Sequence, residues 1–357
     1  MSRTLLSALI LLGTLLLLFI LTPGVLLVLF AGVLLAVAIR AVAVPLAARL
    51  GLGEGWGVMI VSLLAVLMAG FAFWFASDAI SSQAESFRQQ LPELVQRVQE
   101  RLSQYSWGRW VIEQIDPRRL VPSGQTASTA ATYAFSGLGG LLGGLGDVVL
   151  ILLLGLYLAS DPAPYRKAAL ALVAPPGRPR LLAVMDQGGQ ALRGWLLGQL
   201  FSMVVTGTFI GLGLWALGVQ MAGLLALIAA VFGFIPYIGP LISVVPSLLV
   251  ALGQDPSLVP WVIGLFVVSL TVEGNILTPM VQRQTAHLPP AYLLGAQALM
   301  GSGFGLIGVI LAAPLAALTM AAVKVGYVEG WVEAEGPLRA PEGSPAAKAA
   351  TAPEGRG

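Results

Sequence analysis

The sequence of 357 residues contains no cysteine and one histidine, His287. The lack of cysteine excludes disulfides, thiolate metal sites and cysteine nucleophiles, and a single histidine disfavours a His-ligated metal cluster. Charged residues are also scarce, at 10%, whereas 57% of the residues are hydrophobic and the mean hydropathy is +0.88. This composition is outside the range of soluble globular domains and is typical of polytopic membrane proteins.

Nucleotide-binding motifs are lacking too. No GxxxxGK[ST] phosphate loop occurs, so transport by this chain would be passive or driven by a gradient. The segment GFGLIG at 303–308 satisfies GxGxxG, but no strand precedes it and no acidic residue follows about 20 positions later, which favours close helix packing instead. The net charge of +2 forms no nucleic-acid patch. We therefore expect no enzyme activity, cofactor, metal or nucleic-acid partner.

The long Leu, Ala, Gly and Val runs predict an all-α fold, because they lack the alternation of a transmembrane barrel and open strands cannot span lipid. Each span needs roughly 20 apolar residues, which predicts a polytopic transmembrane helical bundle of seven or eight spans. Residues 1–76 would hold three transmembrane helices and residues 77–132 one small helical extramembrane domain. Residues 133–333 would form a transmembrane transport core, and residues 334–357 a disordered tail.

The predicted extramembrane domain carries an apolar stripe at intervals of three and four residues from Ile80 to Leu102, which indicates an amphipathic helix. Pro92 suits the first turn of a second helix better than the middle of one long helix. The stripe fits a helix that lies on its own protein or on the membrane surface, or else a contact between subunits.

The positively biased loop 161–192 predicts the orientation of the chain, since such loops are usually cytoplasmic. Counting spans backward then places the N-terminus inside and residues 77–132 outside the cell. The sequence does not decide whether residues 223–252 and 291–325 cross the membrane or re-enter it.

Prolines and glycines interrupt the apolar helices of the C-terminal half at three places, namely Phe232–Pro240, Thr278–Pro279 and Gly301–Gly305. Non-helical backbone at membrane depth is tolerated only inside protein or beside a cavity, and broken helices often mark transport sites. The residues predicted to break helices or gate a path are Pro236, Gly239, Pro240, Gly274, Pro279, Gly301 and Gly303.

Glu273 is the only acidic side chain in the apolar run from Trp261 to near Pro279. An ionised acid at the bilayer centre costs roughly 2.5 to 3.5 kcal/mol on insertion scales, so such groups usually face a polar cavity. A neutral stripe that includes Thr271 lies near the opposite face of the same helix, with Ser269 on the Glu273 side. The predicted transport or coupling residues are Glu273, Asn275, Thr278 and Gln282.

A structural role for Glu273 stays open, because an ion pair with Arg193 or Arg283 would lock two helices together. Asp147 is a secondary candidate as a proton or ion carrier, although a position near the end of a span also suits an interfacial residue.

Five motifs resemble the autoinducer-2 exporter family in order and spacing. They are ALRGWLLGQL, GLWALGV, FIPYIGP, VEGNILTPMVQ and LPPAYLLGAQALMGSGFGLIGVILAAP, and they cover roughly residues 137–327. The resemblance implies a secondary transporter or exporter of the bacterial cytoplasmic (inner) membrane, assembled as a homo-oligomer, with a pentamer expected. Members are linked to export of the furanone autoinducer-2 and to exchange of sodium or lithium for protons, so the family does not fix the substrate.

Three functions follow as hypotheses. The first is export of a small polar molecule of the autoinducer-2 kind along the neutral stripe. The second is sodium (or lithium)/proton antiport with Glu273 as the carrier, assisted by backbone carbonyls. The third is a scaffold in the cell envelope that transports nothing.

Overall fold

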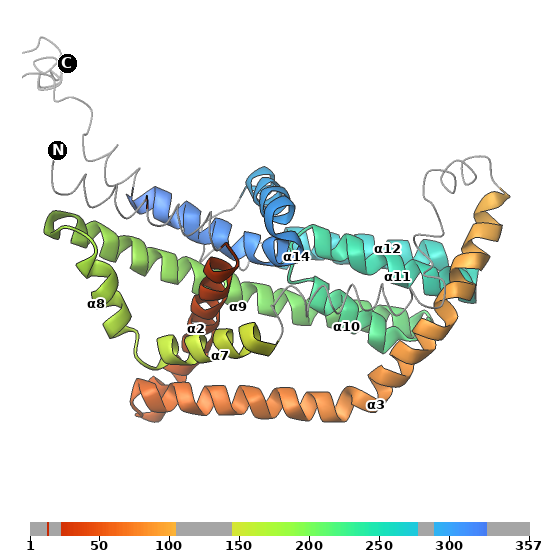
Figure 1. Cartoon of the computed structure of the whole chain (residues 1–357). Coiled ribbons are helices and arrows are strands. Elements are labelled where there is room, and N and C mark those ends of the chain that lie inside the picture. The colour runs from red at the N-terminus through yellow and green to blue at the C-terminus, as the bar shows by residue number, and fades with distance from the viewer. Residues whose placement is uncertain (1–12, 14–22, 105–144, 278–288, 327–357) are drawn as a thin grey trace, which may run out of the picture.

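A computed structural model of the chain describes residues 13, 23–104, 145–277 and 289–326, and these contain helices and no strand. Figure 1 shows the helices as one elongated bundle. In chain order the elements are α2 (Pro23–Leu50), α3 (Glu54–Ser103), α7 (Leu145–Ser160), α8 (Ala163–Ala171), η1 (Pro175–Gly177), α9 (Arg178–Ala216), α10 (Ala222–Phe232), α11 (Ile238–Gln254), η2 (Pro256–Leu258), α12 (Val259–Val272), η3 (Glu273–Leu277, a π-helical turn) and α14 (Pro290–Val323). The all-α prediction is thus confirmed for the part of the chain that the structure describes.

Four helical segments in the described ranges are long and apolar enough to cross a membrane: Gly24–Leu50, Pro175–Ala216, Pro256–Asn275 and Pro290–Gly326. A fifth follows if α7 and α8, which are bent by 93° at their junction, make up one span. Shorter apolar helices occupy 54–68, 222–232 and 238–254. The count of seven or eight spans stays a prediction.

Helix α3 corrects one expectation, because it runs unbroken for 50 residues with Pro92 in its interior. Proline removes one backbone donor from a helix, yet Leu94 and Val95 beside it are buried, and Leu94 joins a core cluster with other helices. Tertiary packing therefore overrides the local preference for a new helix start. Figure 1 shows α3 following one side of the bundle and then turning across the ends of α10 and α11. The predicted boundary between residues 76 and 77 lies inside this helix.

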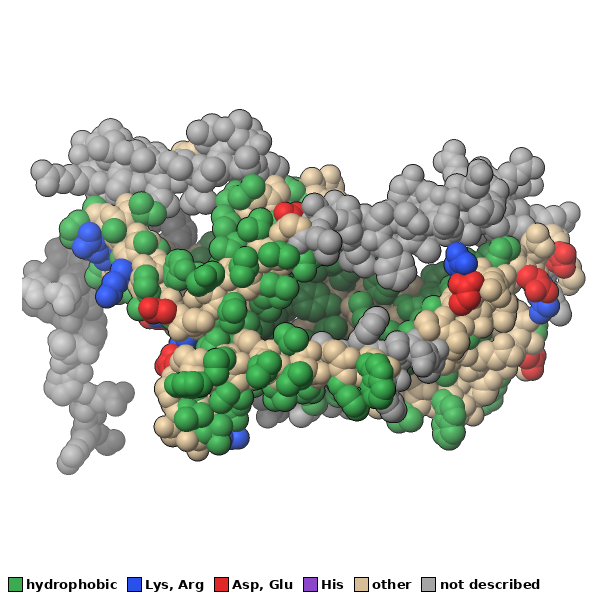
Figure 2. Space-filling view, turned by 60° about the horizontal axis from the view of Figure 1, so that its bottom comes forward, with side chains coloured by type: hydrophobic (Ala, Val, Ile, Leu, Met, Phe, Trp, Pro, Cys, Tyr) green, Lys and Arg blue, Asp and Glu red, His purple; other side chains and the backbone are tan. Residues whose placement is uncertain are grey.

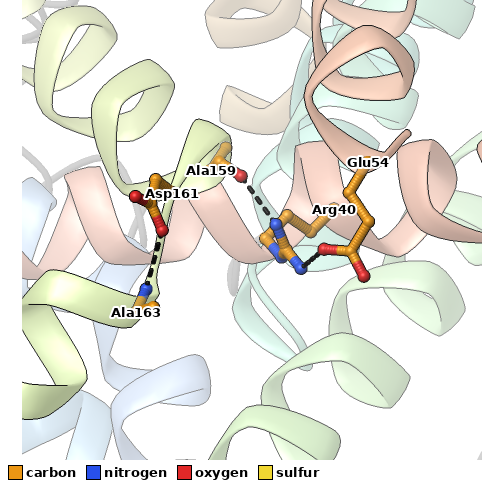
Figure 3. A network of polar contacts seen from close by, with 5 residues as sticks. All are labelled: Arg40, Glu54, Ala159, Asp161 and Ala163. Atoms are coloured by element: carbon orange, nitrogen blue, oxygen red, sulfur yellow. Dashed lines mark hydrogen bonds and ion pairs between the residues drawn. The ribbon is translucent and has the colours of Figure 1, made fainter.

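Close packing joins α2, the first part of α3 and α7. A Cβ atom added at Gly32 would lie 2.9 Å from the Leu154 Cβ, so α2 and α7 approach at a distance that only glycine permits. At the end of this contact, Arg40 forms an ion pair with Glu54 and donates a hydrogen bond to the Ala159 carbonyl at 2.8 Å (Figure 3). The Arg40 guanidinium thus ties three helices together.

Helix α9 is the axis of the C-terminal half and packs against α2, α10, α12 and α14. Figure 2 shows an apolar middle, with most of the charged side chains toward the two ends of the molecule. This distribution is the one expected of a bundle whose middle lies in hydrocarbon and whose ends meet water.

Two of the three predicted helix breaks lie in described residues, and both are confirmed. Helix α10 ends at Phe232 and α11 begins at Ile238, with Tyr237 between them at a φ of 65°. Inside α14 the backbone leaves helical geometry at Gly305, with φ 61° and ψ −144°. The third break, Thr278–Pro279, lies outside the described residues, although α12 already gives way to the π-helical turn at Glu273.

Candidate functional site

A small cavity lies between four helices of the C-terminal half. Helix α9 contributes Thr206 and Ile210, α10 contributes Ala229, and α11 and α12 complete the walls; the remaining lining residues are Pro240, Ser243, Phe266, Ser269, Leu270 and Glu273. Its open space is about that of one water molecule. The cavity therefore suits a proton-bearing group, a water molecule or a bare monovalent cation better than a sugar-sized solute.

Glu273 reaches this cavity from the junction of α12 with the π-helical turn. A π-helical turn widens the helix locally, changes the direction of the following side chains and occurs often at functional sites. The Ser202 hydroxyl of α9 donates a hydrogen bond to the Glu273 Oε1 at 3.3 Å. The carboxylate is thus directed toward α9.

Three hydroxyl groups line the cavity, on Thr206, Ser243 and Ser269, and all three residues are buried. The Ser243 hydroxyl donates to the Pro240 carbonyl at 3.1 Å. A hydroxyl that donates in this way keeps its oxygen lone pairs as acceptors. The cavity therefore combines one carboxylate with neutral hydroxyl oxygens, and oxygen atoms are the ligands that hard cations prefer.

Two buried glutamines donate hydrogen bonds to backbone carbonyls of the helix break beside the cavity. Gln199 of α9 donates from Nε2 to the Gly233 carbonyl at 2.5 Å, and Gln297 of α14 donates from Nε2 to the Pro236 carbonyl at 3.0 Å. Carbonyls freed at a helix end must find partners when they are buried. The break thus has defined partners on two neighbouring helices, and Pro240 follows it directly as part of the cavity wall.

The neutral stripe lies away from the cavity as far as it is described. Thr271 and Asn275 are exposed, and both bond to their own helix: the Thr271 hydroxyl to the Val267 carbonyl at 2.7 Å, and the Asn275 Nδ2 to the Thr271 carbonyl at 3.0 Å. Thr278 and Gln282 lie outside the described residues. In the described part, Glu273 and the stripe do not line one common space.

Of the two basic residues predicted as possible ion-pair partners of Glu273, only Arg193 lies among the described residues. Arg193 donates from Nη2 to the Ala41 carbonyl of α2 at 3.5 Å. It precedes Ser202, the partner of Glu273, by nine positions on α9, a separation of about 14 Å along the helix axis. The contact of Arg193 therefore ties α9 to α2. Arg283 lies outside the described residues, as does Pro279.

Asp147 sits in the first turn of α7. A carboxylate there interacts favourably with the helix dipole, which agrees with the alternative of an interfacial residue. Of the predicted glycines, Gly274 and Gly303 would accept a Cβ atom without contact to any described residue, whereas Gly301 would meet Val309 at 2.8 Å and Gly239 would overlap the backbone of Phe232. Close approach of another backbone segment thus accounts for Gly239 alone among these four.

Sequence reasoning missed several polar residues of the cavity and of the break. These are Gln199, Ser202, Thr206, Ser243 and Gln297. A signal was present in the spacing of polar residues. Ser202 and Thr206 are four residues apart on α9, and Ser269 of α12 is four residues before Glu273. Such pairs share one helix face, and polar pairs in apolar helices usually face protein or a cavity.

Comparison with known proteins places the sequence among membrane transporters. The sequence profile described as "AI-2E family transporter" matches residues 6–327. "Putative transport protein YrrI" of Bacillus subtilis (strain 168) is 30% identical over 162 residues, which are 45% of this chain and 46% of that protein. "Putative transport protein YueF" of the same organism is 22% identical over 279 residues, 74% of each chain. The match to the first relative thus spans about half of that protein.

Proposed function

The chain belongs to the AI-2E transporter family, and we propose that it moves a proton or a monovalent cation on the Glu273 carboxylate as part of secondary transport. The observation that carries this proposal is the cavity that Glu273 lines together with Thr206, Ser243 and Ser269, beside the hydrogen bond that its carboxylate accepts from Ser202. Sodium or lithium exchange for protons is the form of transport that this cavity favours.

The charge of the cavity supports a monovalent rather than a divalent ion. Glu273 is its one carboxylate, and the described residues include no group of three or more His, Cys, Asp or Glu that could hold a metal ion. An ionised glutamate with neutral hydroxyl oxygens balances one positive charge. Protonation of the same carboxyl group would release the cation, which is the alternation that antiport requires.

The size of the cavity separates this function from export of a small polar organic molecule. A furanone is far larger than the space beside Glu273, and Asn275 of the neutral stripe is directed away from it. Such a molecule would need a path other than this cavity. The scaffold hypothesis rested on the amphipathic stripe of α3 as a surface for partners. Phe87 and Leu94 of this stripe pack on the protein itself, so the stripe no longer supports that hypothesis.

The proposal includes the setting of the transporter. We place it in the bacterial cytoplasmic membrane as a multi-pass protein, with loop 161–192 in the cytoplasm and residues 77–132 outside. Large apolar side chains exposed on α3 and α9, among them Leu67, Trp74 and Trp215, suit contact with lipid or with further copies of the chain in a homo-oligomer.

Reconstitution in liposomes tests the proposal. Wild-type protein and Glu273→Gln are compared for proton flux driven by a sodium or lithium gradient, and for release of a labelled furanone. We expect wild type to exchange the cation for protons and the variant to lose this flux, because a neutral amide carries neither ion. Glu100→Gln, which changes an exposed acid on α3, is the matched control and should exchange normally. Equal flux in wild type and Glu273→Gln would refute the assignment.

A further inference from the structure

The C-terminal half of α3, residues 80–103, supplies a missing cap to α10. The residue before this helix, Met221, has a φ of 57° and makes no side-chain capping bond within the described part of the chain. Gln83 of α3 accepts a hydrogen bond at its Oε1 from the Leu224 backbone N–H at 2.9 Å. The first N–H groups of a helix have no partner within it, so Gln83 acts as a cap supplied by another helix.

The same half of α3 also caps the far end of α11. Arg97 donates from Nη1 to the Gly253 carbonyl at 2.9 Å, one residue before α11 ends at Gln254. Glu93 holds the guanidinium from the preceding turn of α3, with Arg97 Nη2 donating to Glu93 at 2.6 Å. A cation at a helix C-terminus is favoured by the free carbonyls and by the helix dipole.

An apolar contact between α3 and α11 lies between these two caps. Leu94 is buried against α11 and belongs to the same core cluster as Val250 and Ile210, with Phe87 packed beside it. A Cβ atom at Gly253 would overlap the end of the Leu94 side chain, so Leu94 packs directly against the α11 backbone at Gly253. This contact is close-packed like a protein interior, not a loose surface contact.

Helices α10 and α11 form one wall of the Glu273 cavity, through Ala229, Pro240 and Ser243. Both outer ends of this helical pair are capped by α3, while its inner end is the break, where the Gly233 and Pro236 carbonyls accept hydrogen bonds from Gln199 and Gln297. We infer that residues 80–103 of α3 and the α10–α11 pair move as one body, and that Gln83 and Arg97 are positioning residues for the cavity wall. The extramembrane helix thereby sets the shape of a site inside the membrane.

A disulfide lock tests whether the two parts move together, and it rests on the proposed function because it is read out by flux. In Leu94→Cys/Gly253→Cys the two Cβ atoms would be 3.8 Å apart, which is the mean separation in disulfides, and the chain has no other cysteine. We expect mild oxidation to form the bond and to leave cation/proton flux within twofold of the reduced protein. A loss of flux on oxidation that a reducing agent restores would show that α3 must leave α11, and would overturn the inference.

A second test needs no transport assay, so it stands even if the proposed function fails. Ser243→Cys places a thiol in the buried cavity wall, and its rate of reaction with a small thiol reagent reports how well the wall is held. Adding Gln83→Leu should raise this rate about fivefold, the factor that corresponds to about 1 kcal/mol for a lost hydrogen bond. Gln83→Glu keeps an acceptor for the Leu224 N–H and should restore the original rate.

Arg88→Met is the matched control, because Arg88 pairs with Glu85 on the exposed face of the same helix. It should leave the reaction rate of the introduced thiol unchanged, and size-exclusion chromatography confirms that each variant is assembled. An unchanged rate in Gln83→Leu, or an equal rise in Arg88→Met, would overturn the positioning role.

Discussion

Replacement of Gly239 by alanine should distort the transport core at its first helix break. Gly239 lies in the first turn of α11, where the chain folds back against the last residue of α10. A Cβ atom there would overlap the Phe232 carbonyl oxygen and lie 2.6 Å from the Phe232 carbonyl carbon. The conflict is with backbone atoms, which cannot rotate away as a flexible side chain would.

The size of the effect follows from this geometry. Carbon atoms in contact prefer a separation of about 3.5 to 4.0 Å, so the two backbone segments must move apart by about 1 Å. Overpacking of this kind costs about 2 to 3 kcal/mol when the surroundings cannot relax. With an unfolding entropy of about 2.1 cal/mol/K per residue, a chain of 357 residues loses roughly 1.3 °C in Tm per kcal/mol, so the Tm should fall by roughly 3 to 4 °C. Pro240 would shift with its neighbour, so transport should fall even well below the Tm.

Thermal unfolding in detergent, followed by tryptophan fluorescence, measures the change. Gly303→Ala is the matched control, because Gly303 was predicted from the same kind of pattern but no described atom lies within 4 Å of a Cβ added there. Its Tm should stay the same or rise, since alanine favours a helix over glycine by about 1 kcal/mol. A Tm for Gly239→Ala equal to that of wild type would refute the argument from close approach.

The features that could be predicted from the sequence are those with a local cause. A proline removes a donor wherever it stands in a helix, and so the break before Ile238 was predictable from Pro236 and Pro240. The cost of placing a charge in hydrocarbon is likewise a property of one residue, which singled out Glu273 before its surroundings were known. In both cases the physical rule needed no knowledge of neighbouring helices.

The remaining features depend on helices that meet in space. Ser202 and Glu273 are 71 positions apart, and only the packing of α9 against α12 makes them partners. Pro92 remains inside α3 because Leu94, two residues later, is buried against α11. The contrast between Gly239 and Gly303 has the same origin, since their local sequences give no sign of which one faces another backbone.

Two further predictions concern polar groups at the margins of the site. The Gln297 residue is 1% exposed and its Oε1 has no hydrogen-bond partner among the described residues, while the Pro236 carbonyl also accepts from the Ile238 N–H at 2.8 Å. Because an unsatisfied buried acceptor costs about 1 to 3 kcal/mol, Gln297→Met should leave the Tm equal or higher, and a clear fall in Tm would contradict this. At the start of the span that carries Glu273, hydrogen bonds from the Ser257 hydroxyl and backbone N–H lower the pKa of Asp255 below its ordinary value of 3.8. For a carboxyl group with a lowered pKa the stabilisation is complete above the ordinary pKa and is lost as the pH falls through the lower, folded value. Thermal melts from pH 6 to about pH 3 should therefore show a larger acid loss of Tm in wild type than in Asp255→Asn, and parallel curves would mean that this carboxylate does not anchor the helix start.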